Sequence, residues 1–253
     1  MLTFSEAQLV AWITPLLWPF IRVLSLFTTA PVLSQRNVPL RARVGLAFLI
    51  TVCAQASLPD MPVVALDSAQ AVLVVLQQVL IGVTLGFAAR IVFSAIEFAG
   101  ELVGLQMGLN YAGFFDPASG SQGTAVGSFF GTTVSWLFII INGHLLLIMA
   151  LVQSFHAFPV GPEPFAFLRA LQPQVWGAEI FKLGLWIALP MITMLLFVNL
   201  VLGVISRVSQ QMNIFAIGFP ITLGVGLLGV LLTLPMMQAP FTMALEQMLA
   251  YFQ

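Results

Sequence analysis

The sequence contains residue types that a serine hydrolase uses, but not their arrangement. Ser119 and Ser121 lie near a glycine, and the histidines are His144 in INGHLLL and His156 in QSFHAF. A hydroxyl nucleophile needs a base and an orienting group within hydrogen-bond reach. No strained nucleophile motif surrounds either serine, and serine beside glycine and proline is typical of a turn. We therefore predict that the chain is not an enzyme and that each histidine is a satisfied polar group in a helix interface.

Patterns for metal, phosphate and redox chemistry are also missing from the sequence. It has no paired aspartates at catalytic spacing, no HExxH motif and no glycine-rich phosphate loop. The sole cysteine, Cys53, cannot form a disulfide within the chain. We predict no cofactor and no metal site.

Charged residues inside apolar stretches are the next candidates for chemistry. Arg90 and Glu97 are seven residues apart, and Glu97 and Glu101 four apart, so on a helix they share about one face. A charge at mid-membrane costs roughly 2.5 to 3.5 kcal/mol on insertion scales. These three charges predict one of two things: an ion or proton path, or a helix end that is surrounded by protein or water. We favour the second, with Arg90, Glu97 and Glu101 as buried charges. Arg22 and Arg207 need partners for the same reason.

These residues belong to a chain whose composition is that of a membrane protein. Apolar residues make up 60%, charged residues only 7%, and the mean hydropathy is +1.07. A soluble domain of this length needs a more charged surface. Several uncharged runs are as long as the roughly 20 residues that span a bilayer as a helix. Because an open chain in lipid can satisfy its backbone only as helix, we predict an all-α integral membrane protein.

The expected elements are about six apolar helices and a short tail. They lie at 5–30, 44–58, 68–108, 124–155, 178–206 and 212–234, with an amphipathic C-terminal helix at 241–252. Prolines predict a loop at 158–174, and a link between the first two helices carries Arg36, Arg41 and Arg43. Without a repeat or a separable soluble part, 1–253 is predicted to be a single membrane domain.

Glycines at a four-residue spacing flank the segment between the third and fourth predicted helices. They are Gly100, Gly104 and Gly108 before it, and Gly123, Gly127 and Gly131 after it. Such spacing puts the missing side chains on one helix face, where another helix can approach closely. The two arms of this hairpin are expected to pack tightly, against each other or against a partner subunit.

Between the glycines runs GLNYAGFFDPASGSQG, which combines helix breakers with aromatic residues. The helix is disfavoured by Asn110, Gly113, Asp116 and Pro117, and the aromatic side chains are Tyr111, Phe114 and Phe115. Non-helical backbone at membrane depth needs protein or a water-filled cavity around it, so these aromatics could plug a cavity. The alternative is an interfacial turn with an aromatic belt, which the residues alone slightly favour.

A second break is predicted in RVSQQMNIFAIGFP. Pro220 removes a backbone donor and Gly218 loosens the turn before it, so the helix should end or kink near 213–220.

A secondary transporter would show corresponding broken helices in two halves of the chain, and the aromatic loop at 108–123 has no matching segment. That leaves a component of a larger channel, whose polar positions are satisfied by other subunits.

Four stretches bring a family resemblance into view. They are WPFIRVLSLFTTAPVLSQRNVPLRARVGLAF (18–48), GLNYAGFFDP (108–117), INGHLLLIMALVQSFHAFPVG (141–161) and LGVISRVSQQMNIFAIGFPITLGVGL (202–227). In this order they resemble the FliR family, the R subunit of the flagellar type III export gate (SctT in injectisomes). The chain departs from the family by having Gln210, where a proline is common, before Gln211.

The resemblance implies a helical assembly in which this chain is the odd subunit among FliP and FliQ copies, with FlhB and FlhA as further partners. A P-like part would run over about 1–175 and a Q-like part over 176–253. The residues implied in subunit packing are the flanking glycines together with Arg207, Asn213, Phe215, Gly218, Phe219 and Pro220.

The resemblance also implies a function for the aromatic loop. It would point into the pore and help to close it, because an apolar constriction stops ions by dewetting and can still part for a polypeptide. The expected function is export of unfolded flagellar proteins across the bacterial inner membrane at the flagellar basal body, without nucleic acid or covalent chemistry. A secondary transporter and the injectisome counterpart are the alternatives.

Overall fold

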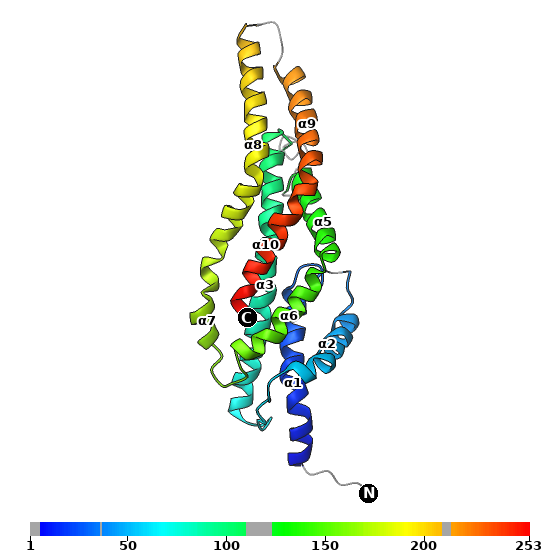
Figure 1. Cartoon of the computed structure of the whole chain (residues 1–253), viewed down its shortest axis with the longest axis vertical. Coiled ribbons are helices and arrows are strands. Elements are labelled where there is room, and N and C mark those ends of the chain that lie inside the picture. The colour runs from blue at the N-terminus through cyan, green and yellow to red at the C-terminus, as the bar shows by residue number, and fades with distance from the viewer. Residues whose placement is uncertain (1–5, 36, 110–122, 209–213) are drawn as a thin grey trace. The chain divides into compact units, whose positions relative to one another are not determined.

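The computed structural model describes residues 6–35, 37–109, 123–208 and 214–253, which are helical and contain no strand (Figure 1). The helices in chain order are α1 (Glu6–Thr29), α2 (Leu40–Ala54), α3 (Ala69–Gln106), α5 (Ala125–Ile140), α6 (Gly143–Ala157), α7 (Ala166–Leu171), α8 (Gly177–Val208), α9 (Ile214–Thr233) and α10 (Gln238–Leu249). Within this described part, five helical segments are long and apolar enough to cross a bilayer, and a sixth if α5 and α6 form one broken span. The prediction of an all-α membrane protein is confirmed.

Several predicted boundaries are wrong, each for a local reason. The helix expected at 124–155 is two helices, because Asn142 adopts the left-handed conformation (φ 57°) before α6. The loop expected at 158–174 contains α7, which also ends at a left-handed residue, Gln172. Pro220 lies in the second turn of α9, inside the helix expected at 212–234, and its missing N–H removes one backbone bond there. The helix end or kink expected near 213–220 stays a prediction.

The chain divides into two compact units. One comprises Met1–Arg90, Asn142–Trp176 and Leu245–Gln253, and the other comprises Ile91–Ile141 and Gly177–Ala244. Helices α3 and α10 therefore contribute to both, and neither unit coincides with the divisions 1–175 and 176–253. We call them the first and second unit.

In the first unit, α1 and α3 approach closely at two glycines of α3. A Cβ at Gly82 would lie 2.8 Å from the Cβ of Ser25, and one at Gly86 would lie 2.8 Å from the backbone nitrogen of Ala30. Neither position can therefore carry a side chain without separating the helices. Gly82 and Gly86 have the same four-residue spacing as the glycines that flank residues 109–122.

Arg22 of α1 is fully buried in the same unit and is held by neutral acceptors. Its Nε donates to Gln78 Oε1 (2.7 Å), Nη1 to the carbonyl and hydroxyl oxygens of Ser154 (2.8 and 3.0 Å), and Nη2 to the carbonyl of Phe158 (3.0 Å). The guanidinium carbon lies 3.7 Å from the centre of the Phe155 ring. The partner expected for Arg22 is thus a set of dipoles and an aromatic face, which joins α1, α3 and α6.

The hydrogen bonds continue from Arg22 into the chain after α6. Gln78 Nε2 donates to Gln77 Oε1 (2.8 Å), and Gln77 in turn donates to the carbonyl of Pro159 (3.1 Å) and accepts from the N–H of Gly161 (3.0 Å). Both glutamines are buried. The network satisfies polar groups that would be costly if left unpaired.

The second unit is held by aromatic and glycine contacts. Phe93 of α3 packs edge-on against Phe138 of α5 and Phe241 of α10, with ring centres 5.4 and 5.5 Å away. Gly184 of α8 lets that helix approach the carbonyl oxygen of Ala95, which would be 2.6 Å from a Cβ at this position. Helices α8 and α9 lie side by side over much of their length (Figure 1).

The first unit's stability should depend on Arg22. In Arg22→Met, the acceptors on Gln78, Ser154 and Phe158 lose their donors, so we expect the free energy of unfolding to fall by about 3 kcal/mol. Unfolding in mixed micelles with increasing denaturing detergent measures this. Arg169→Met is the control, because Arg169 is exposed on α7. Equal midpoints for the two variants would contradict the assignment.

Candidate functional site

The candidate site is the base of the α3 and α5 hairpin, whose arms lead into and out of residues 110–122. The residues predicted to form a pore plug lie outside the described residues: Asn110, Tyr111, Gly113, Phe114, Phe115, Asp116 and Pro117. The same holds for Ser119 and Ser121. The described part of this region is the hairpin base, by which we mean Glu101, Gly104, Gly108, Thr124 and Gly127.

Helix α3 ends in a glycine cap. Gly108 has a φ of 80°, its N–H donates to the carbonyl of Leu105 (3.0 Å), and the N–H of Leu109 donates to the carbonyl of Gly104 (3.1 Å). This is the Schellman pattern, in which a left-handed residue after the last turn satisfies free helix carbonyls. The role of Gly108 that the structure shows is therefore to end α3.

Helix α5 begins with a cap supplied by two side chains. Thr124 is buried, and its hydroxyl accepts from the N–H of Gly127 (3.0 Å). The N–H of Thr124 itself donates to both carboxylate oxygens of Glu101 on α3 (3.0 and 2.8 Å). A carboxylate is stabilised at the positive end of a helix dipole. Sequence reasoning missed Thr124, although threonine before an apolar run is a helix-start signal.

The glycines of one arm face the side chains of the other. A Cβ at Gly104 would lie 2.7 Å from the Cβ of Thr124, and one at Gly100 would lie 2.9 Å from the Cα of Gly127. Each is too close for a real side chain. These glycines were expected to pack against either the other arm of the hairpin or a partner subunit. In the structure they pack against the other arm.

The glycines of α5 accommodate the two glutamates of α3. A Cβ at Gly123 would lie 2.7 Å from Glu101 Oε1, and one at Gly131 would lie 2.8 Å from Glu97 Oε1. At Gly127 it would overlap the Glu101 carboxylate, with the carboxyl carbon only 2.5 Å away. The four-residue spacing of the glutamates therefore matches that of the glycines.

In the chain by itself Arg90 and Glu97 are exposed and Glu101 is half-buried, so the burial of these charges stays a prediction for an assembly. Glu97 and Glu101 both lie against α5, Glu97 next to Gly131 and Glu101 at the start of that helix. Arg207 is likewise exposed, near the end of α8.

The C-terminal motif is only partly described. Asn213 and the side chain of Phe215 lie outside the described residues, whereas Gly218 is buried and Phe219 and Pro220 are exposed on α9. The hydroxyl of Thr222 donates to the carbonyl oxygens of Gly218 (3.1 Å) and Phe219 (3.0 Å). It thus remains satisfied within the helix that contains Pro220.

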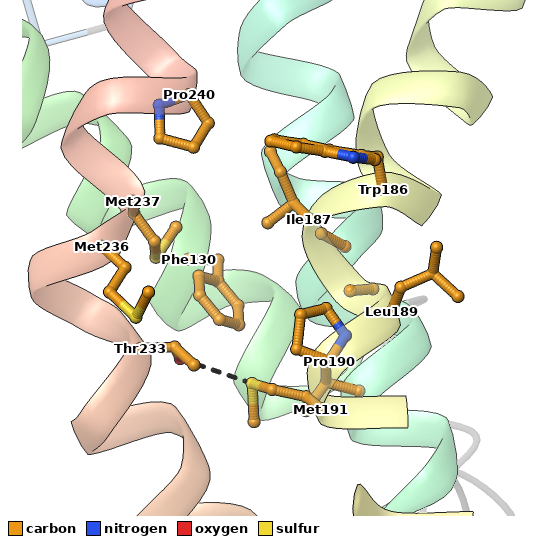
Figure 2. A pocket seen from close by; sticks show the side chains of 13 residues that line it. Phe130, Trp186, Ile187, Leu189, Pro190, Met191, Thr233, Met236, Met237 and Pro240 are labelled. Carbon is orange, nitrogen blue, oxygen red and sulfur yellow. Dashed lines mark hydrogen bonds between the residues drawn. The ribbon is translucent and has the colours of Figure 1, made fainter. Parts of the chain in front are cut away.

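An apolar cavity of about 360 Å³ lies beside the hairpin in the second unit (Figure 2). It is lined by Ala99 and Val103 of α3, Phe130 of α5 and residues of α8, α9 and α10. Figure 2 shows Thr233 next to Met191, whose sulfur accepts from the threonine hydroxyl (3.4 Å). The lining has no acidic or basic side chain, and its hydroxyl, that of Thr233, is hydrogen-bonded to Met191 and to carbonyls of its own helix.

The histidines show no arrangement for catalysis in the part that the structure describes. His156 Nε2 lies 3.4 Å from the carbonyl of Ser57, and His144 Nδ1 is buried with no hydrogen-bond partner among described residues. No group of three His, Cys, Asp or Glu side chains in that part could hold a metal ion.

The hairpin base makes Gly127 sensitive to the smallest side chain. In Gly127→Ala the new methyl group displaces the Glu101 carboxylate from the start of α5, so we expect a loss of about 1 to 3 kcal/mol. Gly203→Ala on α8 is the matched control, because nothing lies within 4 Å of its Cβ position. There alanine should be neutral or stabilising, since it is the better helix former.

The same prediction has a pairwise test. Glu101→Ala removes the group with which the methyl collides, so the double variant should be less destabilised than the sum of the single variants in thermal unfolding. Additive effects would show that Gly127 and Glu101 do not interact.

Comparison with known proteins places this chain in a family. The profile of the family described as bacterial export proteins, family 1, matches residues 13–248. The chain is 44% identical over 243 residues to the flagellar biosynthetic protein FliR of Escherichia coli (strain K12), covering 95% of this chain and 92% of that one. It is 43% identical to FliR of Pectobacterium carotovorum subsp. carotovorum (93% and 90% covered) and 31% identical to FliR of Bacillus subtilis (strain 168) (81% and 80%). The chain belongs to family 1 of the bacterial export proteins.

Proposed function

We propose that this chain is the R-type subunit of a flagellar type III protein export gate and forms part of the channel for unfolded flagellar proteins. The family match along nearly the whole chain supports this, as do relatives that are named flagellar biosynthetic proteins. Those names favour the flagellar apparatus over an injectisome. The membrane would be the bacterial inner membrane at the flagellar basal body.

The observation that carries the proposal is the packing of the hairpin base. The end of α3 and the start of α5 are capped and in contact, with Thr124 against Gly104 and its N–H bound to Glu101. The described residues on either side of 110–122 are therefore capped and packed against each other. This is the support that an inserted aromatic loop needs if it is to close a pore without unravelling its helices.

In this proposal the aromatic side chains make the seal and the breakers shape it. Tyr111, Phe114 and Phe115 would form an apolar constriction, which excludes ions by dewetting. Asn110, Gly113, Asp116 and Pro117 would keep the segment from becoming helix. A sliding polypeptide would part the side chains without any covalent step.

The proposed partners follow from the same assignment. FliP and FliQ subunits would complete the channel wall, and FlhB and FlhA would act with it on unfolded substrates. The division into a P-like part, 1–175, and a Q-like part, 176–253, belongs to this proposal. Energy would be supplied by other components, because the sequence has no nucleotide-binding motif.

Removing the seal should open the pore. Deleting 110–122, or changing Phe114 and Phe115 to alanine, removes apolar surface worth roughly 3 to 5 kcal/mol per ring if fully buried. Cells that express the variant gate should become permeable to ions and small solutes, while export falls only moderately. Conductance across the membrane, or uptake of a small dye, measures this leak.

A surface aromatic provides the control for that experiment. Phe197 on α8 is 68% exposed, so Phe197→Ala removes a ring of the same size without touching the hairpin. A secondary transporter would lose transport without leaking, and an interfacial turn would tolerate the changes. An unchanged leak in a fully assembled complex would therefore end the proposal for 110–122.

The C-terminal motif is proposed to lie at a subunit junction together with Arg207, Asn213, Phe215, Phe219 and Pro220. Gly218→Leu places a large side chain at a buried position of α9 and should reduce co-purification of FliP and FliQ several-fold before conduction changes. Gly224→Leu is the control on the same helix, since its Cβ position is open. Normal assembly with altered transport would instead place Gly218 in the pore.

A further inference from the structure

Helix α2 presents most of its surface outward, although it is apolar enough to cross a membrane. Among its residues only Ala47 and Thr51 are buried, and they lie one turn apart, so a single narrow face packs within the first unit. In the segment from Leu40 to Ser57 only 11% is buried. An apolar helix surface of this kind is covered by lipid or by another protein.

One face of α2 combines a free cation with an apolar track. Arg41 lies in the first turn and is exposed, and helical spacing places Gly45, Phe48 and Val52 above it on the same side. Phe48 is 57% and Val52 46% exposed. Nothing lies within 4 Å of the Cβ position of Gly45, so the track has a notch directly after the arginine.

In the part of the chain that the structure describes, no acidic side chain forms an ion pair with the charge at this end of α2. The sequence has no acidic residue between Glu6 and Asp60, and the first turn of α2 has no acidic side chain. Arg43 is already bound within the chain, because its Nη2 donates a hydrogen bond to the carbonyl oxygen of Gln35 (2.5 Å). Arg41 is therefore the cation of α2 that is available to an outside anion.

We propose that the Arg41 face of α2 binds an anionic phospholipid, with the phosphate at Arg41 and an acyl chain along Gly45, Phe48 and Val52. An arginine at a membrane helix end places its charge in the headgroup region, and anionic lipid adds about 1 kcal/mol of attraction per basic residue. Charge and apolar track are thus in the order of a lipid's headgroup and chain. A neighbouring subunit would instead need a hydrogen-bond acceptor for Arg41 together with an apolar strip at this spacing.

The chain's sole cysteine allows a direct test, since Cys53 is exposed on α2. The full chain, co-expressed with its partner subunits, is labelled there with a fluorophore and reconstituted into vesicles. The vesicles contain phosphatidylethanolamine and phosphatidylglycerol, one of which carries bromine on its acyl chains to quench the fluorophore. Labelling of Cys53→Ser measures the background from other cysteines.

We expect brominated phosphatidylglycerol to quench more strongly, with an apparent preference of about fivefold over phosphatidylethanolamine. Arg41→Gln should remove the preference, whereas Arg169→Gln, which loses an equally exposed charge, should keep it. Gly45→Leu should weaken quenching by both lipids relative to Gly203→Leu, because it fills the notch. Equal quenching by the two lipids, an unaffected Arg41→Gln variant, or an unaffected Gly45→Leu variant would each overturn the proposal. So would absence of quenching by either lipid, which would mean that protein covers this face.

Discussion

The close approach of α3 and α5 is the constraint on which the proposed gate depends. Two carboxylates of α3 lie on a face of α5 where glycine replaces every side chain that would collide with them. Only that absence lets Glu101 reach the N–H of Thr124 and cap α5 from outside the helix. A buried polar group needs such a partner, because leaving it without a hydrogen bond costs more stability than a formed hydrogen bond adds.

In the first unit a buried polar side chain, Arg22, is also hydrogen-bonded, but by a different set of atoms. Among the described residues no carboxylate pairs with Arg22, which is held by an amide oxygen, a hydroxyl, backbone carbonyls and an aromatic face. These acceptors come from helices far apart in sequence, so the guanidinium joins them through bonds of fixed direction. In each unit a polar side chain, Arg22 or Glu101, forms hydrogen bonds between helices and so adds directional contacts to the apolar packing.

The sequence predicted the membrane class and most helices, because apolar length and the capping rules are local. It did not predict the break at Asn142, since the left-handed conformation there is chosen by one residue within a long apolar run. The hairpin glycines could be found by spacing, but the glutamates opposite them could not, because that pairing requires two helices in register. The partners of Arg22 were equally hidden, because they come from two parts of the chain far from it in sequence, Gln78 and residues 154–158. Periodicity showed that Arg90, Glu97 and Glu101 share about one face of α3, but it could not show what that face contacts.

The central claim is that the hairpin base holds the sealing segment in place. Its most direct test leaves 110–122 unchanged and weakens only the support, by measuring ion conductance of assembled gates that carry Glu101→Ala. This variant removes the Glu101 part of the cap on α5, while Thr124 and every aromatic residue of the proposed seal stay unchanged. The account predicts a measurable leak in a complex that still contains all its subunits. A gate that assembles fully and stays closed with Glu101→Ala would contradict it.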